Sequence, residues 1–443
     1  MPAGSPADLP AGTGAGMPSV GACPGSGTPH FAYRSGVLHC EAVPLPELAA
    51  RHGTPLHVYS RRTLVERVGA LRAAFGADAL LCYAVKANGN LGLLRLLHQL
   101  GTGFDVVSGG ELARIVTAGL PTRDVVFAGV AKQAAEIDAA VAAGIRFFNV
   151  ESPHELPLLA AAGARAGRRV PVALRLNPDV AAGGHAYITT ATAANKFGIG
   201  LDAAGEFVQH LAREPWLELV GYHVHLGSQL RSAEPYQQAL AKVLAFCAAA
   251  PERRRGIRYY DLGGGFGIGY GQGAPLDPAA VAAAVLPRLA ELGWQAVVEP
   301  GRHLVGDAGV LLTTVLGHKD SAGTRFLLVD AAMNDLLRPA LYQAEHVIAP
   351  VVPRAGAPSV VDVVGPVCES GDFLARGRAL PPCAVGDRLA VLATGAYGAS
   401  MGSNYNSRCR PAEVLVDGAI AQLVRRRETF DDLFAAERGL PEE

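Results

Sequence analysis

Short apolar runs alternate with amphipathic segments through the middle of the chain. The run from Leu80 to Val85 contains only apolar or aromatic residues, which is typical of a strand buried on both faces. Before it, apolar residues recur every three or four positions and predict a helix from about Arg61 to Phe75. Later runs predict further strands, which begin near Gly103, Val125, Arg146, Val172, Leu219, Tyr259 and Ala296. Helical segments lie between the strands, for example from Leu91 to Leu100 and from Ala134 to Ala143.

Eight successive strand-and-helix units predict a parallel sheet, and eight strands are the number that closes a TIM-like (β/α)8 barrel. An open, doubly wound sheet is the competing arrangement. In a barrel the active site lies at the C-terminal ends of the strands. The predicted strands end at polar residues or glycines, namely Lys86, Asp105, Gly129, Glu151, Asn177, His225, Gly263 to Gly265, and Glu299 to Arg302. An open sheet gives no reason for all eight ends to carry such residues, so we favour the barrel.

The pattern changes beyond about Val310. Short β-rich runs follow, separated by Gly, Pro and Asp, at Phe326 to Val329, Val360 to Val364, Leu389 to Leu392 and Val414 to Val416. They predict a second, mostly antiparallel β domain, and the strands before Tyr59 are expected to join it. We therefore expect a tail over residues 1–29, strands of the β domain over 30–59, the barrel over 60–309 and the rest of the β domain over 310–443.

Composition restricts the partners. The formal net charge of −1 favours neither nucleic acid nor an anionic membrane surface, and no apolar run approaches the length of a membrane span. Residues 1–29 are rich in Gly, Ala, Pro and Ser and lack the pattern of a signal peptide, so we expect a disordered tail. Seven cysteines without a CxxC pair indicate neither a zinc site nor a disulfide framework, and a cytoplasmic location is the default expectation.

The strand ends carry groups with distinct chemistry. Burial at a strand end should lower the pKa of Lys86, and a partly neutral amine can form a Schiff base; a lysine that merely extends its amine to solvent is the plainer alternative. Gly263, Gly264 and Gly265 can bring backbone N–H groups close to an anion, although they could also form only a tight turn. Arg302, at the next strand end, favours a phosphate there.

Two more side chains extend this interpretation. His223 and His225 point to one face of their strand, which could indicate a metal, but no third histidine lies nearby. A flat imidazole at the mouth could instead stack on an aromatic ring, with His225 as the candidate. Glu299 could hold a pyridine nitrogen protonated. Together with Lys86 and the glycine loop, these residues describe a site for pyridoxal 5′-phosphate.

Longer motifs carry a family resemblance. Tyr83 to Asn88, His223 to Gln229, Gly263 to Gly265 and Glu299 to Arg302 resemble the fold-type III pyridoxal-phosphate-dependent decarboxylases. Met333 to Tyr342, Gly365 to Asp372, Gly395 to Tyr397, Asn404 to Asn406 and Arg425 to Thr429 are similar to the diaminopimelate decarboxylases. The resemblance extends from about Tyr33 to Leu433.

The resemblance implies an alanine racemase-like fold and a homodimer with shared active sites. Lys86 would hold the cofactor near Asp105, with His225 on its ring and Glu299 on its nitrogen. The phosphate would be bound by Ser228, Gly263, Gly264, Gly265, Gly301, Arg302 and Tyr397, and Pro300 would be a further cofactor contact. Substrate contacts would come from Arg302, Arg338, Tyr342 and Tyr397, with Glu369 and the proton donor Cys368 from the partner subunit.

The implied reaction is the decarboxylation of meso-2,6-diaminopimelate to L-lysine, the last step of lysine biosynthesis. Arg338 could clamp the distal carboxylate of this substrate, and Glu369 could pair with its distal ammonium. A paralogue for another amino acid stays open, because Ala191 stands where the family usually has glycine. A pyridoxal-phosphate-binding regulator without turnover is the third hypothesis. Glu299 argues against an alanine racemase, which has an arginine at the ring nitrogen.

Overall fold

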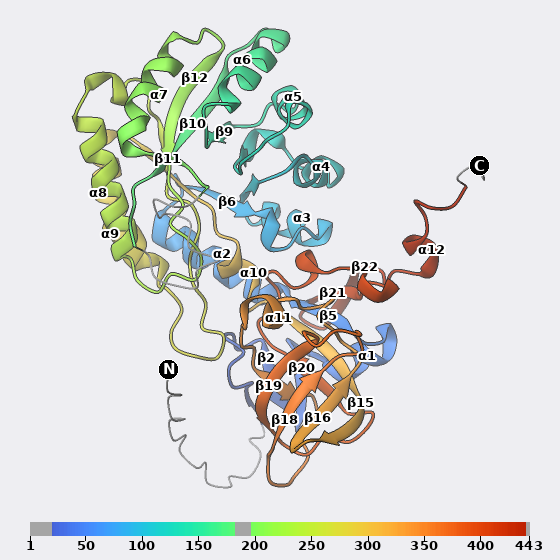
Figure 1. Cartoon of the computed structure of the whole chain (residues 1–443). Helices are drawn as coiled ribbons and strands as arrows, with labels where there is room; N and C mark the ends of the chain where they lie inside the picture. Colours follow the sequence, from blue (N-terminus) through green and yellow to red (C-terminus); the bar gives the residue numbers. More distant parts are fainter. Residues whose placement is uncertain (1–19, 182–195, 440–443) are drawn as a thin grey trace.

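Eight parallel strands close into a barrel, which lies in the upper part of Figure 1. The computed structural model describes residues 20–181 and 196–439. The barrel strands are β6 (Leu80–Ala84), β7 (Gly103–Val106), β8 (Val125–Phe127), β9 (Phe147–Val150), β10 (Val170–Asn177), β12 (Leu217–His223), β13 (Tyr259–Asp261) and β14 (Gln295–Val298). Pairing of β14 with β6 and of β9 with β10 closes the ring. The predicted barrel is confirmed, and each strand begins within two residues of its expected position.

Helices cover the outside of the barrel. They are α2 (Arg61–Phe75), α3 (Leu91–Gln99), α4 (Gly109–Thr117), α5 (Ala134–Ala143), α6 (Glu155–Ala166), α7 (Leu201–Arg213), α8 (Glu234–Ala248) and α9 (Pro278–Leu292). The short strand β11 (Ile199–Gly200) lies beside β10. Alternation along the strands separates two sets of side chains: Leu81 and Tyr83 join the large core beneath the helices, whereas Cys82 belongs to a small separate cluster with Val126. The polar ends of the strands are therefore left at the mouth.

The second domain is a mostly antiparallel sheet, at the lower right of Figure 1. Its strands from the C-terminal part are β15 (Gly309–Ser321), β16 (Thr324–Val329), β17 (Ile348–Pro350), β18 (Ser359–Val364), β19 (Phe373–Leu380), β20 (Arg388–Val391), β21 (Ala412–Asp417) and β22 (Ile420–Arg425). The N-terminal strand β5 (Leu56–Ser60) lies between β15 and β21, antiparallel to the first and parallel to the second. The barrel is thus inserted between two neighbouring strands of this sheet.

The segment before β5 has more structure than its composition suggests. The strands β1 (Val20–Ala22), β2 (Phe31–Arg34), β3 (Val37–Cys40) and β4 (Val43–Pro44) form a small sheet, followed by α1 (Leu45–His52). The expectation of disorder over residues 1–29 is therefore wrong for residues 20–29. Cys23 is buried in an apolar cluster with Phe31, and the Thr28 hydroxyl lies 3.0 Å from that of Thr63 in α2. Tertiary contacts order this stretch.

Within the described residues, no helix is long and apolar enough to cross a membrane. The division of the chain at residues 29, 59 and 309 remains a prediction, as does the disorder of residues 1–19, which lie outside the described part. Ala191, on which the departure from the family pattern rests, also lies outside the described residues.

Candidate active site

Lys86 lies at the mouth of the barrel, in a single 3₁₀ turn (Val85–Ala87) directly after β6. Its Nζ lies 2.6 Å from Oδ2 of Asp105 in β7, which is fully buried, while about a third of the lysine side chain is exposed. Burial acts to lower the pKa of Lys86, but the carboxylates of Asp105 and Glu299 outweigh it and raise the pKa above its ordinary value. The expectation of a lowered lysine pKa is therefore wrong for the cofactor-free protein. Asp105 itself has its pKa raised to about 6 by burial and by Glu299.

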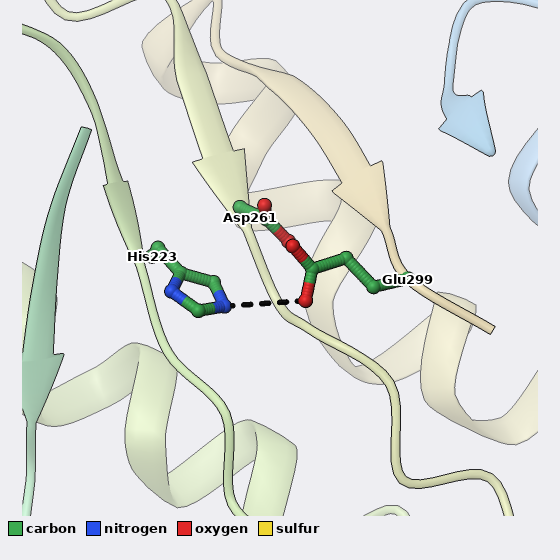
Figure 2. A group of neighbouring side chains, drawn as sticks. All are labelled: His223, Asp261 and Glu299. Carbon is green, nitrogen blue, oxygen red and sulfur yellow. Dashed lines mark ion pairs between the residues drawn. The ribbon is translucent and has the colours of Figure 1, made fainter. Parts of the chain in front are cut away.

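Glu299, directly after β14, lies in a buried polar group with His223 and Asp261 (Figure 2). Nε2 of His223 is 3.3 Å from Oε2 of Glu299, and Nδ2 of Asn149 donates to Oε1 of Glu299 at 3.2 Å. Burial acts to raise the pKa of Glu299, but His223 outweighs it and lowers the pKa. Burial and the neighbouring Glu299 raise the pKa of Asp261 well above its ordinary value. Of the two carboxyls, Glu299 therefore carries the negative charge more readily than Asp261.

This group also explains the histidine pair of the sequence. The ring of His223 faces Glu299, so the function of His223 is its contact with that carboxylate and not a joint role with His225. Ligand atoms of His223, Asp261 and Glu299 lie within 4.8 Å of one another, a spacing that a metal site could also have. The absence of a metal stays a prediction.

His225 lies in the pocket that Lys86 enters. Its Nδ1 accepts a hydrogen bond from the backbone N–H of Gly264 at 3.2 Å, which puts the ring proton on Nε2 in the neutral form. Burial lowers the pKa of His225 well below its ordinary value, and the charges of Arg175 and Lys86 act in the same direction. A neutral, flat ring is thus held at the mouth.

The glycine loop after β13 lies close to neighbouring backbone. Gly263 and Gly265 have φ of +70° and +99°, and a Cβ on Gly264 would lie 2.3 Å from the carbonyl oxygen of Glu299. Only glycine fits these positions. The loop therefore leaves backbone N–H groups accessible where larger residues would block them.

Arg302 begins the short helix α10 (Arg302–Val305) beside this loop. Its Nη2 lies 3.0 Å from Oγ of Ser228, and its Cζ lies 4.8 Å from the ring centre of Tyr397. The side chain is buried and, among the described residues, forms no ion pair with a carboxylate. The pocket around it is lined by Ala84, Lys86, His225, Gly227, Ser228, Gly265, Phe266, Glu299, Gly301, Arg302 and Tyr397.

Arg338 and Tyr342 lie in the helix α11 (Arg338–Tyr342) of the β domain. Arg338 is buried, and its Cζ lies 4.6 Å from the ring centre of Tyr270, whose hydroxyl accepts from Nη1 of Arg302. Tyr270 thus connects the arginine of the barrel to the arginine of the β domain.

Cys368 and Glu369 are exposed, on the loop between β18 and β19. The loop is fixed by Asp372, whose carboxylate accepts from the N–H groups of Met333 and Val367 at 2.6 and 2.7 Å. Among the described residues that line the pocket around Lys86, neither Cys368 nor Glu369 occurs. Their roles stay predictions.

Sequence reasoning missed several members of the site. Asp261 lies two residues before Gly263, at the end of the predicted strand, so its position gave a signal. Asn149 alternates inward on β9 and could have been found in the same way. Tyr270 and His346, whose Nε2 lies 2.7 Å from Nη1 of Arg338, gave none, because they lie in irregular segments far apart in the sequence.

Pyridoxal phosphate fits these residues. Arg302 is buried with no hydrogen-bond partner for its Nε, and the glycine cradle lies beside it, as a phosphate would require. Glu299 is ionised and deep in the pocket, where it could bind a protonated ring nitrogen, and Lys86 supplies an amine at the same pocket.

Comparisons with known proteins agree with this geometry. A family model described as "Pyridoxal-dependent decarboxylase, pyridoxal binding domain" matches residues 61–306. The chain is 47% identical over 401 residues to a diaminopimelate decarboxylase of Neisseria meningitidis serogroup A, covering 90% of this chain and 98% of that protein. It is 47% identical to a diaminopimelate decarboxylase of Pseudomonas aeruginosa, covering 93% and 99%. A crystal structure of diaminopimelate decarboxylase from Helicobacter pylori complexed with L-lysine superposes with a TM-score of 0.85 at 38% identity, covering 89% and 99%.

Proposed function

The chain belongs to the pyridoxal-dependent decarboxylases and, within them, to the diaminopimelate decarboxylases, and we propose that it converts meso-2,6-diaminopimelate to L-lysine and CO2. The observation that carries the proposal is the match over nine-tenths of the chain to proteins of that name. The predicted family, fold, enzyme class and cofactor are thereby confirmed.

We assign the cofactor contacts as follows. Lys86 would hold pyridoxal phosphate, His225 would lie against its ring, and Glu299 would bind its nitrogen. The phosphate would be held by Ser228, Gly263, Gly264, Gly265, Gly301, Arg302 and Tyr397, with Pro300 as a further cofactor contact. Bound pyridoxal phosphate supplies an electron sink for the electron pair that remains when CO2 leaves. The ionised state of Glu299, maintained by His223 and Asn149, supports a protonated ring nitrogen, which deepens that sink.

The substrate contacts follow from charge. Arg302 and Arg338 are buried cations without carboxylate partners among the described residues, so together they can bind the distal carboxylate of the substrate. Tyr342 and Tyr397 would complete the binding site for this part of the substrate. Glu369 would pair with the distal ammonium group.

Cys368 would donate the proton that replaces CO2 on the substrate carbon. Because its loop is exposed and does not line the pocket of its own chain, a second copy would have to present it, together with Glu369. This supports a homodimer with shared sites. A cytoplasmic location is supported by the cysteines, all seven of which lie in the described part of the chain and are free.

The test is direct. Purified protein loaded with pyridoxal phosphate is incubated with meso-2,6-diaminopimelate, L-lysine, L-ornithine and L-arginine, and CO2 and the amine product are measured. We expect CO2 and L-lysine in equal amounts from diaminopimelate and little release from the other three amino acids. Faster release from any of those three would reject the substrate assignment, and no release from any would reject the enzyme.

A further inference from the structure

Arg302 and Arg338 form an uncommon pair of buried cations. Their side chains are 7% and 6% exposed, and the Nε of each has no hydrogen-bond partner. In residues 20–181 and 196–439, neither forms an ion pair with a carboxylate. Burial and the charge of Arg302 both lower the pKa of Arg338. Two like charges at such a site cost free energy, so something must hold them in place without neutralising them.

Tyr270 contacts both arginines. Nη1 of Arg302 donates to the Tyr270 hydroxyl at 2.5 Å, and Cζ of Arg338 lies 4.6 Å from the ring centre, over the face of the ring. The backbone of Tyr270 has φ of +49°, a left-handed conformation that a tyrosine rarely adopts. A strained backbone is retained where the surrounding contacts determine it.

His346 holds Arg338 from the other side. Its Nδ1 lies 2.8 Å from the carbonyl oxygen of Leu392, which can only accept, so Nδ1 carries the proton. Nε2 therefore presents a lone pair to Nη1 of Arg338, 2.7 Å away. The imidazole is 1% exposed, and its edge packs against Tyr270 with ring centres 5.2 Å apart. A carboxylate at this place would hold Arg338 as well, but it would cancel the charge.

We propose that Tyr270 and His346 are positioning residues that fix Arg302 and Arg338 without a carboxylate of the protein, so that Arg338, together with Arg302 beside the cofactor phosphate, is left for the distal carboxylate of an amino-acid substrate. The inference rests on the proposed function and adds to it a source of selectivity. Neutral partners fix the position of the arginines, so the substrate supplies the missing negative charge. A diamine without that carboxylate leaves the charge of Arg338 unpaired.

Two ligands test this in the holoenzyme. L-lysine, bound as the reaction product with its ε-amine towards the cofactor, places its carboxylate at the distal site, and cadaverine is the same diamine without it. Binding of both is measured by titration of the cofactor absorbance and by calorimetry in the wild type, Tyr270→Phe, His346→Gln and His346→Glu. Tyr222→Phe is the matched control, because its buried hydroxyl donates to the carbonyl oxygen of Arg253 and not to an arginine side chain.

The expected changes differ between the ligands. L-lysine should bind about tenfold more weakly to Tyr270→Phe, because a hydrogen bond that orients Arg302 is lost. His346→Glu should weaken the binding of L-lysine at least as much. The affinity for cadaverine should change less than twofold or increase. His346→Gln, which can accept from Arg338 and donate to Leu392, should lie between the wild type and His346→Glu. For diaminopimelate, KM should rise while kcat changes little.

The opposite results are equally clear. The inference would be overturned if L-lysine bound to His346→Glu as tightly as to the wild type. It would also be overturned if Tyr270→Phe weakened the binding of both ligands equally. If one variant fails to fold in a thermal melt, the other two decide. Failure of the proposed function would show differently, as a wild type that does not decarboxylate diaminopimelate at all.

Discussion

Asp105 sets the charge of Lys86 in the cofactor-free protein, and Asp105→Asn tests that relation. The substitution keeps the shape of the side chain and removes its negative charge. At 2.6 Å and an effective dielectric constant of about 20, the attraction between the two charges is about 6 kcal/mol. Lys86 is about a third exposed, so solvent screening reduces this value several-fold. A ten- to hundredfold rise in the neutral fraction of Lys86 is the expected result.

Only the neutral amine attacks the aldehyde of pyridoxal phosphate, so attachment of the cofactor should accelerate by a similar factor. Apoprotein is mixed with pyridoxal phosphate in a stopped-flow instrument, and the absorbance change is followed between pH 6.5 and 9. The rate in Asp105→Asn should exceed the wild-type rate by this factor at every pH in the range.

Glu111→Gln provides the control. Glu111 lines the same side of the mouth, but its carboxylate accepts from the N–H of Val107 and forms no hydrogen bond or ion pair with Lys86. Its loss should change the attachment rate less than threefold. An attachment rate in Asp105→Asn that is unchanged or slower would refute the reasoning, because Asp105 would then not suppress the reactivity of Lys86.

Further predictions concern catalysis, assembly and stability. Lys86→Ala should lose turnover and the visible absorbance of lysine-bound cofactor; a persisting band would place the attachment elsewhere. Arg338→Ala should lower kcat/KM for diaminopimelate about 30- to 1,000-fold but affect weak activity on L-lysine much less, and equal losses would contradict its role. Mixed Lys86→Ala and Cys368→Ala subunits should recover about a quarter of wild-type activity, whereas none after proven exchange would show that both act within one chain. Burial lowers the pKa of His57 to about 4, so its contribution to stability is complete above pH 6.5 and declines by about 1.4 kcal/mol per pH unit towards pH 4. The free energy of unfolding, measured with urea, should fall less steeply with decreasing pH in His57→Gln than in the wild type. Identical slopes would reject this prediction.

The regular part of the fold could be predicted from local pattern. The expected helix from Ala134 to Ala143 coincides with α5, and Lys86 follows its strand as predicted. Both depend on residues adjacent in the sequence, where periodicity and turn residues suffice. The C-terminal ends of the parallel strands of a barrel lie on one side of it. The predicted strands therefore place Lys86, Asp105, His225 and Glu299 together at the mouth.

The predictions that were wrong concern features that depend on contacts between segments far apart in the sequence. Residues 20–29 look disordered by composition, yet Cys23 is buried by other segments. The pKa of Lys86 follows from Asp105 in the next strand, which outweighs burial. His346 contacts Arg338 within the β domain, but it meets Tyr270 only because the β domain packs on the barrel. No pattern of neighbouring residues in the sequence predicts such contacts.

The position of β5 between β15 and β21 has a consequence during synthesis on the ribosome. β5 ends at Ser60 and its antiparallel neighbour begins at Gly309, with the whole barrel between them. At about 5–20 residues per second, the nascent strand waits roughly 12–50 s for that neighbour to be translated. The barrel strands emerge during this interval, whereas the apolar residues of β5, such as Leu56 and Val58, stay without their sheet. Completion of the β domain is thereby tied to completion of the barrel, and a chain that stops short of β15 leaves β5 open to chaperones or to aggregation.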